Sequence, residues 1–235
     1  MAGRTEHRCQ PGSKPSTLAA TYPTTTFSTI MLQAPPTIRL PRPDELPNNP
    51  EVFERLKARE SANIVQGFTL NYNATHDLPF KFYAEINIDN CRLWHLFRNL
   101  ADLMPDTLSC IYNLYQEDPI YSDYIDKTLI LGQLHKHKTE LTEDCNLEFG
   151  LIYHTEDHLE EIFVSDSKFV KFWGINESLF RQTMTDIGLI EIPDLNFIDE
   201  FPKVVEPLTK FNDKAKPTDS VIQDLNDFFS LIEKN

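Results

Sequence analysis

A regular alternation of apolar and polar side chains between residues 79 and 88 constrains the fold more than any other feature of this sequence. Apolar side chains occupy every second position, at Phe80, Phe82, Ala84, Ile86 and Ile88, and the residues between them are Lys81, Tyr83, Glu85 and Asn87. Successive side chains of a β-strand point to opposite faces of a sheet. The segment therefore predicts a strand with one buried face and one wet face.

The elements predicted around this strand favour an α+β fold. Further strands are expected at 64–72, 108–115, 146–153, 159–165 and 168–173, and the strands at 146–153 and 159–165 should form a hairpin. Helices are expected from Asn49 onward and at 90–104, 118–137, 176–187 and 219–233. Strands outnumber helices in the middle of the chain and do not alternate regularly with them. This favours a central antiparallel or mixed sheet with helices packed on one face.

Residues 1–48 differ in composition from the rest of the chain. They are rich in Thr, Ser and Pro, and six prolines fall between Pro35 and Pro50. Proline favours an extended, solvated backbone, so we expect a disordered N-terminal tail over 1–48 and a single acidic α+β domain over 49–235. An organelle transit peptide, or an upstream extension with an internal start at Met31, is an alternative interpretation of the tail.

The net charge of −14 is unevenly distributed along the chain. Residues 1–43 carry five basic side chains and one acidic, so the remaining 192 residues hold 17 basic and 35 acidic side chains, a net charge of −18. A body with this charge repels nucleic acid and anionic lipid and attracts cationic surfaces. We therefore expect no nucleic-acid partner for the folded part.

Neither a membrane segment nor a secretory signal is expected. No apolar run approaches the roughly 18 to 20 residues that cross a bilayer, and the N-terminus lacks the pattern of a signal peptide. The four cysteines lie far apart and never in a Cys-x-x-Cys pair. Reduced thiols and a cytoplasmic location are the interpretation that these features favour.

The glycine-rich motifs that bind nucleotide phosphates are missing from this sequence. The chain has 7 glycines, none of them clustered, and it contains neither a P-loop nor the dinucleotide-binding fingerprint. We predict no cofactor.

His154 and His158 raise the question of a metal site. On a helix their spacing would direct both imidazoles to one ion, which makes a metal-dependent hydrolase an alternative function. However, Thr155 takes the place of the general-base Glu of a His-Glu-x-x-His motif, and the segment lies between two predicted strands. We therefore favour a polar hairpin tip without a metal.

A thiol–imidazole pair is the second catalytic candidate. Cys91 and His95 are four residues apart on the predicted helix 90–104. A reactive thiolate needs an electropositive, partly exposed setting, whereas this helix is rich in apolar residues. We expect Cys91 to belong to the core, and the sequence leans away from an enzyme.

Acidic side chains gather in two stretches that contain no Lys or Arg. Nine acids lie between Thr139 and Ser167, and five more lie between Asp186 and Glu200. Aromatic residues are interleaved with these stretches or adjacent to them: Phe149, Tyr153, Phe163, Phe172, Trp173 and Phe197. Two interpretations stay open, a solubilising surface over an aromatic core and a binding face for a basic protein.

The function predicted here is that of a non-enzymatic binding protein whose acidic, aromatic-bearing face engages a basic protein partner. The residues expected to contact that partner are Glu148, Glu156, Asp157, Glu160, Glu161 and Trp173. One form of the hypothesis is an immunity or antitoxin-type inhibitor of a basic toxin. A structural or scaffold domain is a further alternative, and the oligomeric state stays open.

Overall fold

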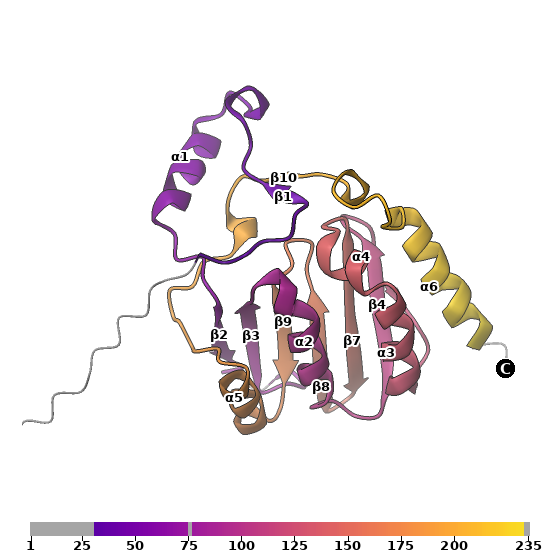
Figure 1. Cartoon of the computed structure of the whole chain (residues 1–235). Coiled ribbons are helices and arrows are strands. Elements are labelled where there is room, and N and C mark those ends of the chain that lie inside the picture. The colour runs from indigo at the N-terminus through magenta and orange to yellow at the C-terminus, as the bar shows by residue number, and fades with distance from the viewer. Residues whose placement is uncertain (1–30, 75–76, 233–235) are drawn as a thin grey trace, which may run out of the picture.

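An antiparallel sheet forms the centre of the computed structural model, which describes residues 31–74 and 77–232 (Figure 1). Within these residues the sheet has eight strands. Their spatial order is β2 (Gly67–Tyr72), β3 (Phe82–Asn87), β9 (Val170–Gly174), β8 (His158–Val164), β7 (Leu147–Thr155), β4 (Thr107–Leu114) and β5 (Ile120–Tyr121), and β6 (Ile125–Asp126) pairs with the start of β4. All of these strand pairings are antiparallel, and the predicted α+β class is confirmed.

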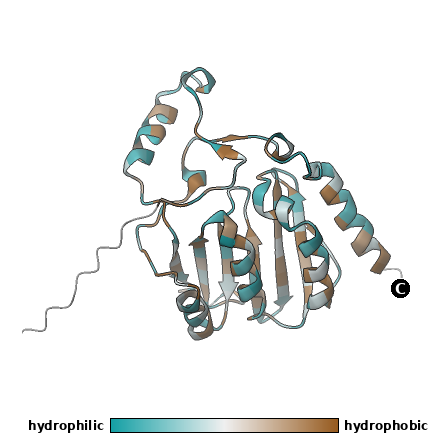
Figure 2. Ribbon diagram, viewed as in Figure 1, coloured by the Kyte–Doolittle hydropathy of each residue, from teal (hydrophilic) through white to brown (hydrophobic). Residues whose placement is uncertain are grey.

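The helices lie against one face of this sheet. They are α2 (Asn90–Ala101), α3 (Lys127–Lys136), α4 (Lys138–Glu143), α5 (Glu177–Asp186) and α6 (Thr218–Ile232). In Figure 1 helices α2, α3 and α5 stand in front of the strands, and α6 lies beside β4 and α3. Hydrophilic and hydrophobic residues alternate around the helices, as Figure 2 shows, so each helix turns an apolar side to the sheet.

The core fills the space between the helices and the strands. Its largest fully buried side chains are Phe82, Phe97, Phe149, Phe172 and Phe180, with Ile86, Leu93, Leu96, Leu100, Leu108, Ile111 and Ile130. Burial of one such side chain stabilises a fold by about 1.5 to 3 kcal/mol. The strand residues of the main cluster share one sheet face, since Phe82, Ala84 and Ile86 belong to it and the residues between them do not.

Residues 31–48, which the sequence placed in the tail, form part of the folded structure. Strand β1 (Ile38–Arg39) pairs with β10 (Val204–Val205), and Asp89 accepts a hydrogen bond from the backbone of Gln33. The expected boundary at residue 49 is therefore corrected for residues 31–48. The first thirty positions of the predicted tail lie outside the described residues.

Short helical segments connect this region to the sheet. Asn49 caps α1 (Pro50–Ala58) as predicted, because its side chain accepts a hydrogen bond from the backbone N–H of Glu51 at 3.0 Å. The remaining segments are 3₁₀ turns: η1 (Pro43–Glu45), η2 (Arg59–Ser61), η3 (Ile198–Glu200) and η4 (Leu208–Lys210).

The predicted helix 118–137 is wrong in its first half. Residues 120–126 instead supply β5 and β6, both of which pair with β4. Helix α3 begins only at Lys127, where the Asp126 side chain accepts a hydrogen bond from the backbone N–H of Thr128. The edge of β4 thus gains backbone hydrogen-bond partners. A helix starting at Asp118 would have left these backbone groups of β4 without them.

The sheet face turned away from the helices, called the open face below, is covered only at one end. The segment 190–192 runs along the edge of β2, and the Ile192 side chain lies where a Cβ on Gly67 would be. Phe197 and Leu195 pack on Phe169 at the same end. Among the described residues, no helix lies across the rest of this face (Figure 1).

None of the helices in the described residues is both long and apolar enough to cross a membrane.

Candidate functional site

Glu160 and Glu161 lie on opposite faces of the sheet. Strand β8 alternates, so Glu160 points to the helix side with Ile162 and Val164, and Glu161 points to the open face. The sequence assigned both residues to one partner-binding surface. The structure separates them.

Glu161 lies in a row of side chains that crosses the open face. Its cross-strand neighbours are Trp173 on β9 and Ile152 on β7, and Trp173 in turn pairs with Tyr83 on β3. The Tyr83 and Trp173 rings lie 4.8 Å apart between centroids. We call the half-buried residues Tyr83, Ile152, Glu161, Phe163, Lys171 and Trp173 the open-face patch.

The carboxylate of Glu161 is poorly solvated in this patch. Burial among apolar neighbours raises the pKa of the Glu161 carboxyl to about 7, against a smaller lowering by the charge of Lys171. Among the described residues, no hydrogen bond or ion pair is found for this side chain. The Lys171 ammonium instead lies over the Phe169 ring, 5.3 Å from its centroid. Lys171 therefore only partly compensates the charge of Glu161, which lies among mainly apolar and aromatic side chains.

The other predicted contact residues lie apart from this pair. Glu148 is on the open face near the far end of β7, where its carboxylate accepts hydrogen bonds from Asn113 Nδ2 and from the backbone N–H of Asp166. Glu156 and Asp157 are exposed at the β7–β8 turn. Of the six predicted residues, the structure brings together Glu161 and Trp173 as direct cross-strand neighbours.

Sequence reasoning missed the patch residues Tyr83, Ile152 and Lys171 as functional candidates. The alternation along 79–88 placed Tyr83 on the wet face of its strand, which was a usable signal. What was lacking was the strand order, because β3 and β9 are distant in sequence and adjacent in space.

Much of the acidic stretch 139–167 supports the fold and does not form a surface. Glu140 accepts a hydrogen bond from the backbone N–H of Lys216, and Asp144 accepts one from the Thr218 hydroxyl. Asp166 pairs with Lys203 at 2.5 Å. All three acids are buried. Several predicted aromatic anchors are also core residues, since Phe149 and Phe172 are buried on the helix side.

The two histidines of the alternative metal site point to opposite faces of the hairpin. His154 pairs across the strands with Leu159, and His158 pairs with Thr155, so the two imidazoles diverge. No group of three or more His, Cys, Asp or Glu arranged to hold a metal is found in the described residues. The helical spacing that motivated the hydrolase hypothesis is therefore not formed.

Cys91 is exposed on α2, and its predicted place in the core is wrong. The error arose because the apolar residues of α2 occupy one side of the helix, whereas Cys91 and His95 lie on the other. His95 contacts Asn99. Cys110 and Cys145 are free and buried, and burial raises the pKa of both thiols.

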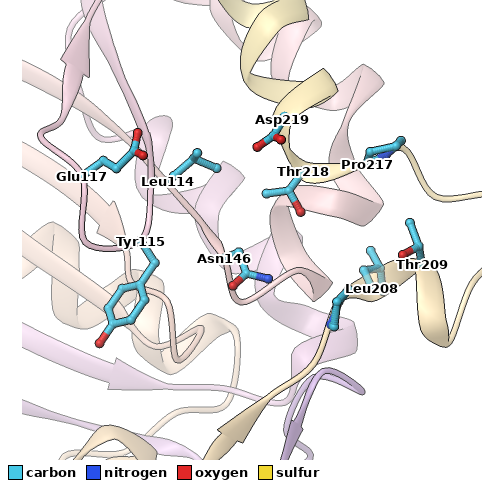
Figure 3. A pocket seen from close by; sticks show the side chains of 10 residues that line it. Leu114, Tyr115, Glu117, Asn146, Leu208, Thr209, Pro217, Thr218 and Asp219 are labelled. Atoms are coloured by element: carbon cyan, nitrogen blue, oxygen red, sulfur yellow. The ribbon is translucent and has the colours of Figure 1, made fainter.

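A cavity of about 510 Å³ lies between the end of β4, the start of β7 and the start of α6. Figure 3 shows Thr218 and Asp219 of α6 facing Leu114 and Asn146 across it. Its lining residues include two acids, Glu117 and Asp219, and no His, Cys, Lys or Arg. The lining therefore supplies neither a thiol nor an imidazole for nucleophilic or acid–base chemistry.

Comparison of the chain with protein-family models, with curated proteins and with solved structures finds no match.

Proposed function

We propose that this chain is a non-enzymatic binding protein whose open-face patch engages a cationic surface of a protein partner. The observation that carries the proposal is the half-buried carboxylate of Glu161, which lies between Trp173 and Ile152 and has no hydrogen-bond or ion-pair partner among the described residues. A guanidinium or ammonium group placed beside this carboxylate would stabilise its negative charge, which water solvates only poorly there.

The aromatic side chains of the patch fit the same role. The Trp173 and Tyr83 rings pack against each other at an angle of 39° and offer a large, rigid apolar area, and such aromatic side chains are enriched in binding hot spots. The charge of the whole chain, −14, favours a basic partner over a second copy of the chain. Two copies docked through this face would bring two Glu161 carboxylates together.

The partner class that we favour is a basic toxin, such as a nuclease, which the chain would inhibit as an immunity or antitoxin-type protein. The acidic body supports rapid, electrostatically steered association with such a protein. The free thiols of Cys91, Cys110 and Cys145 fit a reducing, cytoplasmic setting for this inhibition.

Affinity capture with three matched baits tests this proposal. The full-length wild-type chain, Glu161→Lys and Glu54→Lys are each immobilised at low salt, and retained proteins are identified by mass spectrometry. Glu54 is an exposed acid on α1, so its reversal changes net charge equally without touching the patch. We expect one basic protein to be retained by the wild type and Glu54→Lys baits, and lost from Glu161→Lys.

The captured protein is then purified, and its association is measured directly. We expect the association rate to fall by at least tenfold between about 50 and 500 mM salt. A partner that Glu161→Lys retains equally well, or whose binding is insensitive to salt, contradicts the proposal. Retention of a multi-component assembly by all three baits would instead favour a scaffold domain.

A further inference from the structure

A cavity of about 360 Å³ opens on the helix side of the sheet, where β8 and β9 meet the end of α2 and the start of α5. Its apolar lining residues are Leu103, Met104, Pro105, Phe172, Ile175 and Leu179, and its polar ones are His158, Glu160 and Asn176. Cavities of this size, mostly apolar with a few convergent polar groups, are typical of small-ligand sites.

Glu160 is the unusual residue of this cavity. Its side chain is 8% exposed, and no hydrogen-bond donor to its carboxylate is found among the described residues. Its neighbour is His158, whose Nε2 atom lies 3.2 Å from Glu160 Oε2. That Nε2 atom is buried, and within the described part of the chain it has no hydrogen-bond partner of acceptable geometry. The two groups are therefore in contact, but they do not form a hydrogen bond with each other.

The imidazole is held in this position from its other side. The Tyr153 and His158 rings meet edge to face, with centroids 5.0 Å apart. This contact packs the imidazole against an aromatic ring of the neighbouring strand β7.

His158 is the one basic side chain among the lining residues of the cavity, and no hydrogen bond of acceptable geometry joins it to Glu160. Neither Lys nor Arg is among the lining residues. Lys127 approaches the same region, but its ammonium already donates to the carbonyl oxygens of Ala101 and Met104, and it lies 3.6 Å from Asp106. A buried carboxylate in an apolar cavity normally has a cationic or hydrogen-bonding partner.

We propose that this cavity binds the ammonium or guanidinium end of an alkyl chain. The cationic group pairs with Glu160, and the alkyl stem packs on Leu103, Phe172 and Leu179. The inference does not rest on the proposed function, because Glu160 and Glu161 face opposite sides of β8.

Binding of three six-carbon probes to the full-length chain tests the chemistry. Hexylammonium carries the cation, hexanol is neutral and hexanoate is an anion, while the alkyl stem stays the same. We expect hexylammonium to bind at least tenfold more tightly than hexanol in calorimetric titration, and hexanoate not to bind. Equal affinities for hexylammonium and hexanol would overturn the proposal.

Two variants locate the site, and a matched control excludes a general charge effect. Glu160→Gln keeps the shape of the side chain and is expected to lower the affinity for hexylammonium at least tenfold. Leu179→Trp fills the cavity from its rim, where Leu179 is 50% exposed, and should abolish binding without unfolding the chain. Glu54→Gln, at an exposed acid on α1 outside both sites, should change the affinity less than twofold. Unchanged binding to both Glu160→Gln and Leu179→Trp would overturn the assignment.

The same chemistry has two possible sources, which a fourth probe separates. Nα-acetyl-lysine amide presents the ammonium on a peptide-like unit, as a Lys side chain of a protein would. Tighter binding of this probe than of hexylammonium assigns the cavity to a side chain of a polypeptide. Tighter binding of hexylammonium assigns it to a free alkylamine, and failure of both probes to bind refutes the inference.

Discussion

At the scale of single residues, Glu161 contributes unfavourably to stability at neutral pH. Its pKa is raised from the ordinary 4.5 to about 7, mainly by burial among apolar side chains. The folded chain therefore holds this proton more tightly than the unfolded chain does. Between these two pKa values the folded state binds more protons, so the free energy of unfolding falls as the pH rises, and it is constant above about 7 with respect to this group.

The substitution Glu161→Gln is expected to remove this fall in the free energy of unfolding with rising pH. Relative to wild type, the variant should gain about 1 to 3 kcal/mol in free energy of unfolding as the pH rises from 4.5 to 8. Urea unfolding at a series of pH values measures the difference. Glu54→Gln on α1 serves as the control and should track wild type at every pH. Parallel curves for wild type and Glu161→Gln would show that the carboxylate is well solvated in the folded chain, which would contradict this prediction.

The alternation of a strand puts Glu160 and Glu161 on opposite faces, yet the sequence-based prediction assigned both to one binding surface. The prediction of β8 at 159–165 came close to the observed His158–Val164. Which of its two faces is covered by helices depends on tertiary packing, and no local pattern reveals it. The same lack of tertiary information explains the wrong prediction for Cys91. Which side of α2 faces solvent becomes clear only when the packing of its buried side is known.

At the scale of elements, Gly150 allows β7 and β8 to pair closely. A methyl group added at Gly150 would overlap the carbonyl oxygen of Ile162 on the neighbouring strand. Gly150→Ala should therefore destabilise the fold by about 2 kcal/mol or more, as overpacking does elsewhere.

Gly132 offers a matched control on α3, because a methyl group there meets no atom within 4 Å. Gly132→Ala should stabilise the protein by about 0.5 to 1 kcal/mol, since alanine favours helix over glycine. Chemical unfolding of both variants checks the opposite signs. A neutral effect of Gly150→Ala would mean that β7 and β8 pair less closely than described.

Elements with strong local signals were predicted well from the sequence. Alternation identified β3, and capping residues identified the starts of α1 and α5. Gly188, with φ 74°, ends the α5 segment as expected. The failures lie where tertiary contacts decide the structure. Residues 120–126 became strands because β4 supplied an edge, and β1 formed because β10 returned to pair with it from the other end of the chain.

At the scale of the whole molecule, the strand order creates the candidate binding site. The row Tyr83, Trp173, Glu161 and Ile152 draws one residue from each of four strands that are adjacent in space. The sequence showed a chain rich in acidic and aromatic residues. It could not show which of the acids form hydrogen bonds or ion pairs within the fold. Glu140, Asp144 and Asp166 are used within the fold, whereas Glu161 stays unpaired within the described residues.

In the complex that we propose, a cation of the partner lies beside Glu161. Such a cation lowers the pKa of this carboxyl from about 7, so binding at pH 7 must release protons. Calorimetry of the captured partner in two buffers of different ionisation enthalpy measures this release. We expect loss of about half a proton per complex for wild type and none from residue 161 in Glu161→Gln. Equal proton release by the two proteins would contradict the placement of a cation beside Glu161.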